Sequence, residues 1–447
     1  MAGFHSEAGN SCPLEDLNVA STVSSRVPGL GTMADLRATL ADPVGMLERF
    51  HRSYGNAFKL HAAMGFRFTY LNGPDGYRAV TSLRADQAGM GGVLAQVPII
   101  GGWFYRTQCD DDSLEALAVA TRRVLGRMVT PAKIRRARLA ERTIECTASA
   151  ASRWTSSVDL SDALPRIIYE SAMRYFLGDS LWSRYGSELC SLYRGVVEVS
   201  DIRRIALSRT PLRYAMSEYR AARRLQNVLE EILRSPLAES SPAVREINRV
   251  QVESAGIAVG DRPWILMFLL WNAVAYSGSY AIWALIDILT KPDIRQRFEV
   301  GAPDRVNLAS RCLWETIRLH PLGIVTRKVK QELIYRDQHQ ACQIPAGEYV
   351  GTLVTAVTKD PERFPEPEIY NPDRYLVGPP PLDVIYGRGP FGCVGREFSR
   401  ILITTVLVEL LDQHSMRLIS APPRRHSRLH LLYPKVPVVA AVHRRAG

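Results

Sequence analysis

A single cysteine near the C-terminal end of the chain stands among residues that suit a reactive thiol. The stretch 386–395 reads YGRGPFGCVG, with Cys393 after three glycines and Gly395 two residues beyond it. A helical pattern follows over 396–411. Because the start of a helix carries unpaired N–H groups and the positive end of the helix dipole, this position is predicted to stabilise a thiolate. The thiolate is the form in which cysteine binds metals.

The glycines around this cysteine indicate what kind of metal centre it would serve. They permit positive φ angles and let a flat ligand approach the backbone closely. A thiolate presented in this way is suited to an axial bond with a haem iron. Taken alone, however, a glycine-rich loop before a helix is more often an ordinary turn around a buried thiol. The metal interpretation therefore depends on residues elsewhere in the chain.

Further patterns occur in a fixed order before the cysteine loop. A predicted helix over 306–320 carries Glu315 and Arg318, which share one helix face at i and i+3. The segments HPLGIVTR, PERF and YNPDRY follow, and the last of them contains Arg374. Together with the aromatic–glycine–cysteine–glycine spacing of 386–395, these segments resemble the cytochrome P450 family. The resemblance covers most of the chain from about Ala118 onward.

The resemblance implies a mainly α fold with a small β region, the cytochrome P450 fold, as a single domain. It places a haem domain at 31–447 after a flexible arm at 1–30. Cys393 would bind the iron of haem b. In the same loop, the resemblance assigns haem-contacting positions to Tyr386, Gly389, Phe391 and Gly395. A structural triad behind the loop would consist of Glu315, Arg318 and Arg374.

Two arginines are expected to contact the haem propionates. Arg122 lies on a predicted helix over 113–128, capped by Asp112 or Ser113, and Arg327 lies on a predicted strand. Guanidinium groups match carboxylates in geometry and charge. Two positions that usually contact propionates in the family are Ala118 and Phe391 here. The alternative for Arg122 is a solvated helix residue.

The most apolar stretch, 264–286, contains no charged residue. It is long enough to span a bilayer, but its mid-chain position and its polar side chains favour a buried central helix. In the family such a helix crosses the haem face with the pattern Ala/Gly-Gly-x-acid-alcohol. Here Ser277 keeps the alcohol, Tyr276 replaces the acid and Val274 replaces the glycine. Ser277 is expected to assist proton delivery, with Tyr276 either helping or serving only as a packing residue.

Composition limits the class of protein, its partners and its redox compartment. The chain has 447 residues, 46% hydrophobic and 23% charged, which are globular values. Its net charge is +11, but its basic residues are dispersed and argue against a nucleic-acid partner. They fit a docking face for an acidic redox protein, or a solvated surface, equally well. Seven scattered cysteines argue against a disulfide framework or a zinc site and suggest a reducing compartment.

Residues 1–30 show no signal peptide, so we expect a cytoplasmic protein without a membrane anchor. The resemblance implies that the glycine-rich region 88–112 and the segment 426–440 border the substrate site, although 88–112 is equally compatible with a packed surface loop. We predict haem-thiolate oxidation of a lipophilic small molecule, by hydroxylation or epoxidation, in secondary metabolism. Electrons would come from a separate ferredoxin or flavin reductase. The alternatives are a haem-thiolate isomerase or dehydratase, and a catalytically idle haem or ligand-binding protein.

Overall fold

The structure is a computed structural model. It describes residues 42–61, 67–94, 97, 99–100, 110–197, 207, 210–254, 256–299, 304–337, 341–377, 380–423, 433–434 and 436–445. The predicted arm at 1–30 lies outside these residues, as do parts of the regions 88–112 and 426–440.

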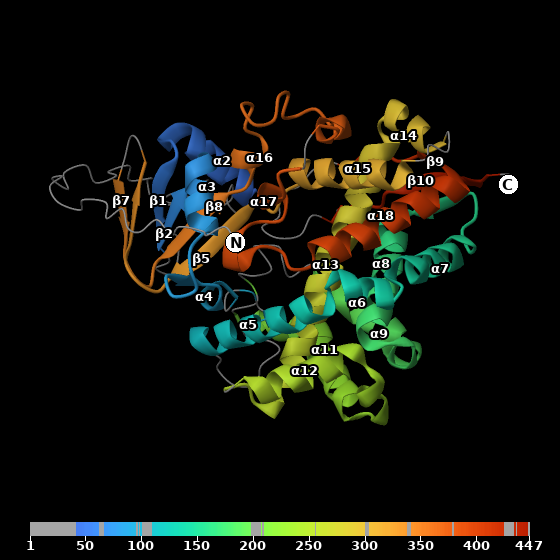
Figure 1. Cartoon of the computed structure of the whole chain (residues 1–447), viewed down its shortest axis with the longest axis horizontal. Coiled ribbons are helices and arrows are strands. Elements are labelled where there is room, and N and C mark those ends of the chain that lie inside the picture. The colour runs from blue at the N-terminus through green and yellow to red at the C-terminus, as the bar shows by residue number, and fades with distance from the viewer. Residues whose placement is uncertain are drawn as a thin grey trace, which may run out of the picture.

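Most of the described chain is helical, and the helices gather on one side of the molecule (Figure 1). The longer helices of this part are α5 (Asp111–Met128), α7 (Leu139–Ala151), α8 (Leu160–Leu177), α9 (Asp179–Val197), α11 (Ser217–Arg234), α12 (Pro242–Glu253), α13 (Arg262–Leu289), α15 (Arg305–Leu319) and α18 (Arg396–Gln413). The shorter ones are α6 (Pro131–Arg136), α14 (Pro292–Glu299) and α17 (Leu382–Ile385). Single 3₁₀ turns are η4 (Pro211–Ala215), η5 (Pro236–Ser240), η6 (Val259–Asp261), η7 (Pro372–Tyr375) and η8 (Gly389–Phe391).

A small β region occupies the other side (Figure 1). Its main sheet has five strands in the order β1-β2-β8-β5-β3. These strands are β1 (Ala57–His61), β2 (Arg67–Leu71), β8 (Tyr349–Leu353), β5 (Ile324–Val329) and β3 (Ala88–Gly89). The short helices around them are α2 (Pro43–Tyr54), α3 (Gly73–Thr81), α4 (Gly91–Leu94) and α16 (Thr355–Thr358). The strands β6 (Leu333–Arg336) and β7 (Ala341–Ile344) form a hairpin. A third sheet of β4 (Ser157–Asp159), β10 (Val439–Arg444) and β9 (His414–Leu418) lies on the helical side, where β9 contacts α18 (Figure 1).

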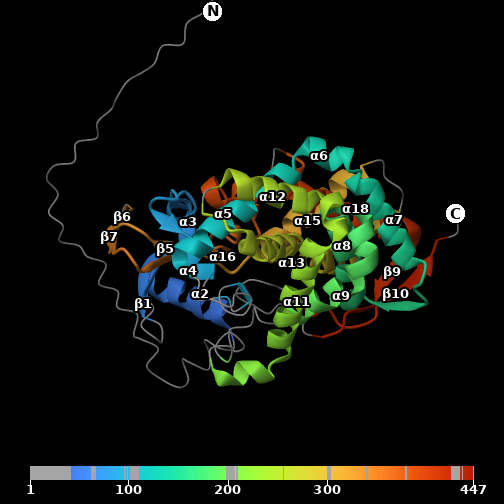
Figure 2. The ribbon, with the colours of Figure 1, turned by 90° about the horizontal axis from the view of Figure 1, so that it is seen from below.

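Helix α13 is the centre of the helical part. The apolar stretch predicted at 264–286 forms this helix of 28 residues, which starts with a proline in its first turn, where no N–H is needed. Helices α5, α8, α11, α15 and α18 pack around it (Figure 2). It is long and apolar enough to cross a membrane, but 83% of its most apolar window is buried inside the protein. Burial by neighbouring helices accounts for its composition, as the sequence predicted.

Helix α5 begins earlier than predicted, and its cap is a different residue. The helix starts at Asp111, and the Asp110 side chain accepts a hydrogen bond from the Ser113 N–H at 2.7 Å. The predicted caps, Asp112 and Ser113, lie inside the first turn, where acidic residues and small polar residues are also favoured. Glu115 bonds outside its own helix. Its carboxylate accepts hydrogen bonds from the N–H groups of Met90 and Gly91, each at 2.6 Å. This contact ties α4 to α5.

Two glycines allow a paired test of this junction. A Cβ added at Gly91 would collide with the Asp111 carbonyl oxygen, whereas a Cβ at Gly126 on the exposed side of α5 would meet nothing within 4 Å. We expect Gly91→Ala to destabilise the protein by about 1–3 kcal/mol, because α4 must move away from α5. We expect Gly126→Ala to stabilise it by about 0.5–1 kcal/mol, because alanine loses less entropy in a helix. Equilibrium denaturation measures both, and equal effects would contradict the assigned packing.

Candidate active site

The cysteine loop is a tight structure that ends at the start of α18. The Cys393 N–H donates to the Tyr386 carbonyl at 2.8 Å, and the Gly392 N–H donates to the Gly389 carbonyl at 3.1 Å. Gly389 has a φ of 64°, and a Cβ there would lie 2.9 Å from the Thr81 carbonyl oxygen. Glycine is therefore required at 389 both by its backbone angle and by the close approach of the end of α3.

The Cys393 thiol lies in an environment that is both enclosed and accessible. Cys393 as a residue has exposed surface. Many protein atoms nevertheless surround its thiol, and this burial raises the pKa of the thiol above its usual value of about 9. The backbone N–H of Gly395 and the positive charges of Arg122 and Arg396 lower the pKa, but they do not outweigh burial. An accessible sulfur inside a burying environment fits a thiol that faces an internal space. The helix start therefore offsets the effect of burial only in part, and a metal-bound thiolate at Cys393 stays a prediction.

One face of α13 lies toward this space. Every residue from Trp264 to Leu289 is buried except Asn272 and Tyr276, which are one helical turn apart. Tyr280, a further turn along the same face, keeps 9% of its surface. Burial raises the pKa of Tyr276 to about 12, and the charge of Cys393 contributes to this rise. The accessible face of α13 is thus the face that is electrostatically coupled to the cysteine.

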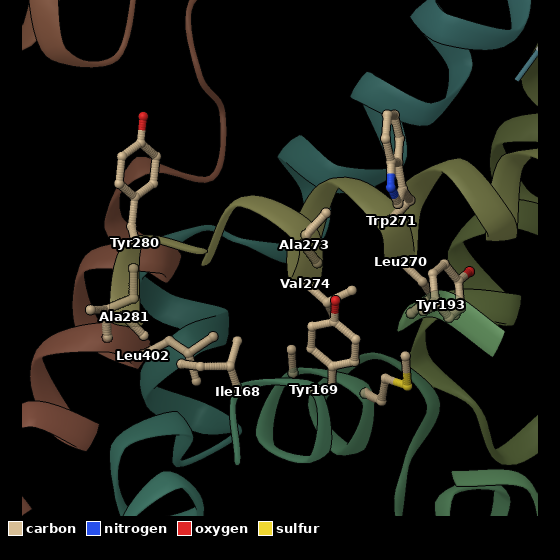
Figure 3. Close-up of a cluster of buried hydrophobic side chains, with 14 of the residues drawn as sticks. Ile168, Tyr169, Tyr193, Leu270, Trp271, Ala273, Val274, Tyr280, Ala281 and Leu402 are labelled. Carbon is tan, nitrogen blue, oxygen red and sulfur yellow. The ribbon is translucent and has the colours of Figure 1, made fainter. Parts of the chain in front are cut away.

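Tyr280 and Tyr386 also interact electrostatically with Cys393. The pKa of Tyr280 is raised by burial, with further contributions from Tyr276, Tyr386 and Cys393. Burial and then Cys393 likewise raise the pKa of Tyr386. Figure 3 shows Tyr280 projecting from α13 away from Ile168 and Tyr169, the α8 side chains on the opposite side. The hydroxyl of Tyr280 donates to the His320 carbonyl at 3.1 Å, which fixes its ring.

Two arginines contribute positive charge near this space. Arg327 on β5 is 6% exposed, and burial lowers its pKa to about 10. Glu115 and Tyr77 oppose that shift, whereas the positive charge of Arg122 adds to it. The pKa of Arg122 is itself lowered by burial and raised by Cys393. Two arginines that repel each other beside one carboxylate form a cationic surface that suits further carboxylates.

The structure places the other predicted site residues less directly. Ser277 is buried on α13, about 100° around the helix from Tyr276, so it lies beside the accessible face rather than on it. Phe391 lies in η8, and its side chain is outside the described part of the structure. Gly395 precedes α18, and a Cβ there would lie 4.0 Å from the Cys393 sulfur. The roles of these three residues toward a cofactor stay predictions.

Glu315, Arg318 and Arg374 are brought into one buried cluster. The Arg318 guanidinium donates to both Glu315 carboxylate oxygens, at 2.9 and 2.7 Å, and Arg374 Nε donates to Oε1 at 3.0 Å. Both Glu315 and Arg318 are fully buried. The remaining Arg318 donors reach the carbonyls of Thr358, Pro367 and Ile369. A doubly paired, fully hydrogen-bonded carboxylate is the arrangement in which a buried charge is tolerated.

Sequence reasoning missed several members of these clusters. The Tyr375 hydroxyl donates to Glu315 Oε2 at 2.9 Å, and the Asn371 N–H donates to Oε1 at 3.0 Å. Both lie in the YNPDRY segment, so their proximity to Arg374 was a usable signal. Tyr280 could have been found from its spacing of four residues after Tyr276. Glu115 gave no such signal, because its partners Met90 and Gly91 lie in another element.

Comparison with known proteins agrees with this geometry. The cytochrome P450 family model matches residues 292–439, which include Glu315, Arg327, Arg374 and Cys393. The chain is 26% identical over 192 residues to the mouse (Mus musculus) 24-hydroxycholesterol 7-alpha-hydroxylase, covering 37% of this chain and 39% of that protein. It is 28% identical over 148 residues to the mitochondrial cholesterol side-chain cleavage enzyme of Oncorhynchus mykiss, covering 29% of this chain and 28% of that protein. The chain thus matches less than two fifths of the length of these relatives.

The mainly α fold, the buried triad and the cysteine loop are consistent with the family that this comparison indicates. Residues 292–439, which carry the triad and the cysteine loop, match the cytochrome P450 family. Members of this family bind haem b, and the residues around Cys393 fit that group. Cys393 has exposed surface, Arg122 and Arg327 would suit the propionates of a haem, and the apolar residues of α13 would suit the haem ring.

The triad provides a test of its structural role. We expect Glu315→Ala to destabilise the protein by about 3–5 kcal/mol, because Arg318 and Arg374 would be left near each other without a carboxylate. Glu315→Gln keeps the shape without the charge and serves where the alanine variant does not fold. Glu188→Ala, which breaks an exposed pair with Arg224, is the matched control and should leave the free energy of unfolding unchanged within error. Similar stability of all three variants would argue against the role.

Proposed function

We propose that the protein is a haem-thiolate monooxygenase that hydroxylates or epoxidises a lipophilic small molecule. The observation that supports this best is the position of the Cys393 sulfur, accessible inside the protein and electrostatically coupled to Tyr276 on the accessible face of α13. When bound, haem supplies oxygen-atom transfer from dioxygen, with two electrons and two protons consumed for each oxygen inserted.

The chain's own residues would hold the cofactor and the substrate. Cys393 would bind the iron through its sulfur, and Arg122 and Arg327 would bind the two propionates. Apolar side chains of α13, among them Leu269 and Ala273, would exclude water from the reacting carbon. Burial raises the pKa of the free Cys393 thiol because it removes water from the charged form. The same removal of water would strengthen the attraction between the deprotonated sulfur and a metal cation.

Proton delivery would differ from that of family members with a carboxylate on this helix. Because the pKa of Tyr276 is about 12, its hydroxyl keeps its proton throughout the neutral range. Tyr276 can therefore donate a hydrogen bond toward the reacting oxygen, but it exchanges protons less readily than a carboxylate would. Ser277, one residue further on, is proposed to pass the proton with the help of water or a substrate hydroxyl.

The substrate class and the partners are proposed from related proteins and from composition. The two relatives described above are named for reactions of cholesterol or of a hydroxycholesterol, which supports a lipophilic substrate here. Electrons would come from a separate ferredoxin or flavin reductase, and the dispersed positive charge of the chain suits an acidic donor. A cytoplasmic role in secondary metabolism is proposed on the same basis.

A second candidate is a haem-thiolate isomerase or dehydratase. Tyr276 in place of a carboxylate favours it, because rearrangement without dioxygen requires no proton relay of that kind. The two candidates differ in their requirements. Product formed only with NAD(P)H and a reductase supports the monooxygenase, whereas product formed without either supports the isomerase or dehydratase.

The sulfur ligand is tested by the absorption spectrum of the reduced, carbon monoxide-bound protein. We expect wild type to show the Soret band typical of a thiolate ligand and Cys393→Ala to lose it, because alanine offers the iron no ligand. Cys342→Ala, at a buried thiol in β7, is the control and should keep the band. A thiolate-type spectrum in Cys393→Ala would disprove the assignment.

The proposed proton donor is tested by removing one hydroxyl. We expect Tyr276→Phe to lower product formed per NAD(P)H consumed by about tenfold or more, since positioned proton transfer contributes at least that much. The carbon monoxide spectrum should not change. Ser277→Ala measures the second hydroxyl, and Tyr214→Phe, at an exposed tyrosine in η4, is the control. Unchanged coupling in both Tyr276→Phe and Ser277→Ala would leave these residues with packing roles only.

A further inference from the structure

The accessible face of α13 carries a second polar residue, Asn272, that the proposed oxidation does not use. Asn272 and Tyr276 alone keep appreciable accessible surface between Trp264 and Leu289. Their spacing of four residues places them on one face, about 6 Å apart along the helix axis. Asn272 therefore lies one helical turn before Tyr276 on the same partly exposed face of α13.

The hydrogen bonding of Asn272 leaves most of its amide unused. Its Nδ2 donates to the Phe268 carbonyl at 2.6 Å, one turn earlier in the same helix. An amide side chain has two N–H donors and an oxygen that can accept twice. Within the described part of the chain, Oδ1 and the second N–H form no hydrogen bond, and the residue is partly exposed.

Neither helix formation nor packing accounts for an asparagine at this position. Asparagine is among the poorer helix formers, and alanine would be better by roughly 0.5 kcal/mol. Among the residues that the structure describes, the side chain bonds only to its own helix, at the Phe268 carbonyl. Its two neighbours one turn earlier, Phe268 and Leu269, are apolar. A polar group held in an apolar surface gains most from a polar partner that enters the space.

We propose that Asn272 is a specificity-determining residue whose amide binds a hydroxyl or carbonyl oxygen of an otherwise apolar substrate. The inference rests on the proposed function and extends it, because it defines the substrate class as a lipophilic molecule that already carries one oxygen. With that oxygen held at Asn272, the carbon to be oxidised lies nearer Tyr276 and the metal. The hydrogen bond would orient the substrate along α13, which fixes the distance between the existing oxygen and the site of reaction.

The orientation has a consequence for selectivity. A substrate that lacks the oxygen would leave the Asn272 amide without a partner in an apolar surface, so the site would disfavour it. Hydrophobic contacts with Phe268 and Leu269 would be similar for both substrates. Discrimination would thus depend on the amide, and a side chain of similar volume without an amide would remove it.

The test uses the haem-loaded, full-length protein and ligands that bind iron directly. Phenylimidazole anchors through its ring nitrogen, and its meta- and para-hydroxyphenyl analogues carry one hydroxyl away from that anchor. Dissociation constants from the shift of the Soret band give the preference for each hydroxylated ligand over the parent. We expect this preference to fall about fivefold in Asn272→Ala for at least one analogue, as loss of one neutral hydrogen bond implies.

Two further variants make the result specific. Asn272→Leu keeps the volume and should lose the preference equally, which excludes an effect of an enlarged space. Asn248→Ala, at an exposed position of α12, should keep the wild-type preference. The same preference in wild type and both Asn272 variants, for both analogues, overturns the inference while leaving the proposed function intact. A wild-type protein that takes up no haem overturns the proposed function together with the inference that rests on it.

Discussion

The carboxylate of Glu315 is the interaction on which the arrangement around the cysteine depends. It is fully buried, and an isolated charge in that position would be strongly unfavourable. Arg318, Arg374, Tyr375 and the Asn371 N–H satisfy its two oxygens between them. These partners come from α15 and from η7, so the charge can be buried only when both segments are in place.

Placing η7 against α15 also places the chain that leads to the cysteine. The segment after η7 runs through α17, which contacts α15, into the loop at 386–395. On the far side of the loop, α18 packs against both α13 and α15. The cysteine is therefore held between two elements that the buried charge and the apolar core fix independently. Such a scaffold can keep a thiol in position within a space that is otherwise energetically costly for a polar group.

Helix α13 combines structural and chemical roles through its uneven burial. Three of its sides pack against other helices, where any charge would be costly, and this explains a composition that resembles a membrane span. On the remaining face it carries Asn272, Tyr276 and Tyr280, which are polar but uncharged near neutral pH. Neutral groups that form hydrogen bonds are compatible with an apolar substrate beside them, whereas a buried carboxylate would add a large desolvation cost.

Local patterns in the sequence determined much of this protein. The spacing of YGRGPFGCVG indicated the cysteine loop, the i and i+3 pair indicated the triad, and the uncharged stretch indicated a central helix, because each depends on neighbours within a few residues. The pKa values, the contacts between distant segments and the exposure of single side chains were decided by the tertiary structure. The pKa of Cys393 depends on burial by distant segments and on the charge of Arg122 from α5. Cys393 in turn raises the pKa of Tyr276 on α13. The link from Glu115 to Met90 and Gly91 and the accessibility of Asn272 likewise exist only once distant segments pack, since local sequence carries no information about which face of a buried helix is left uncovered.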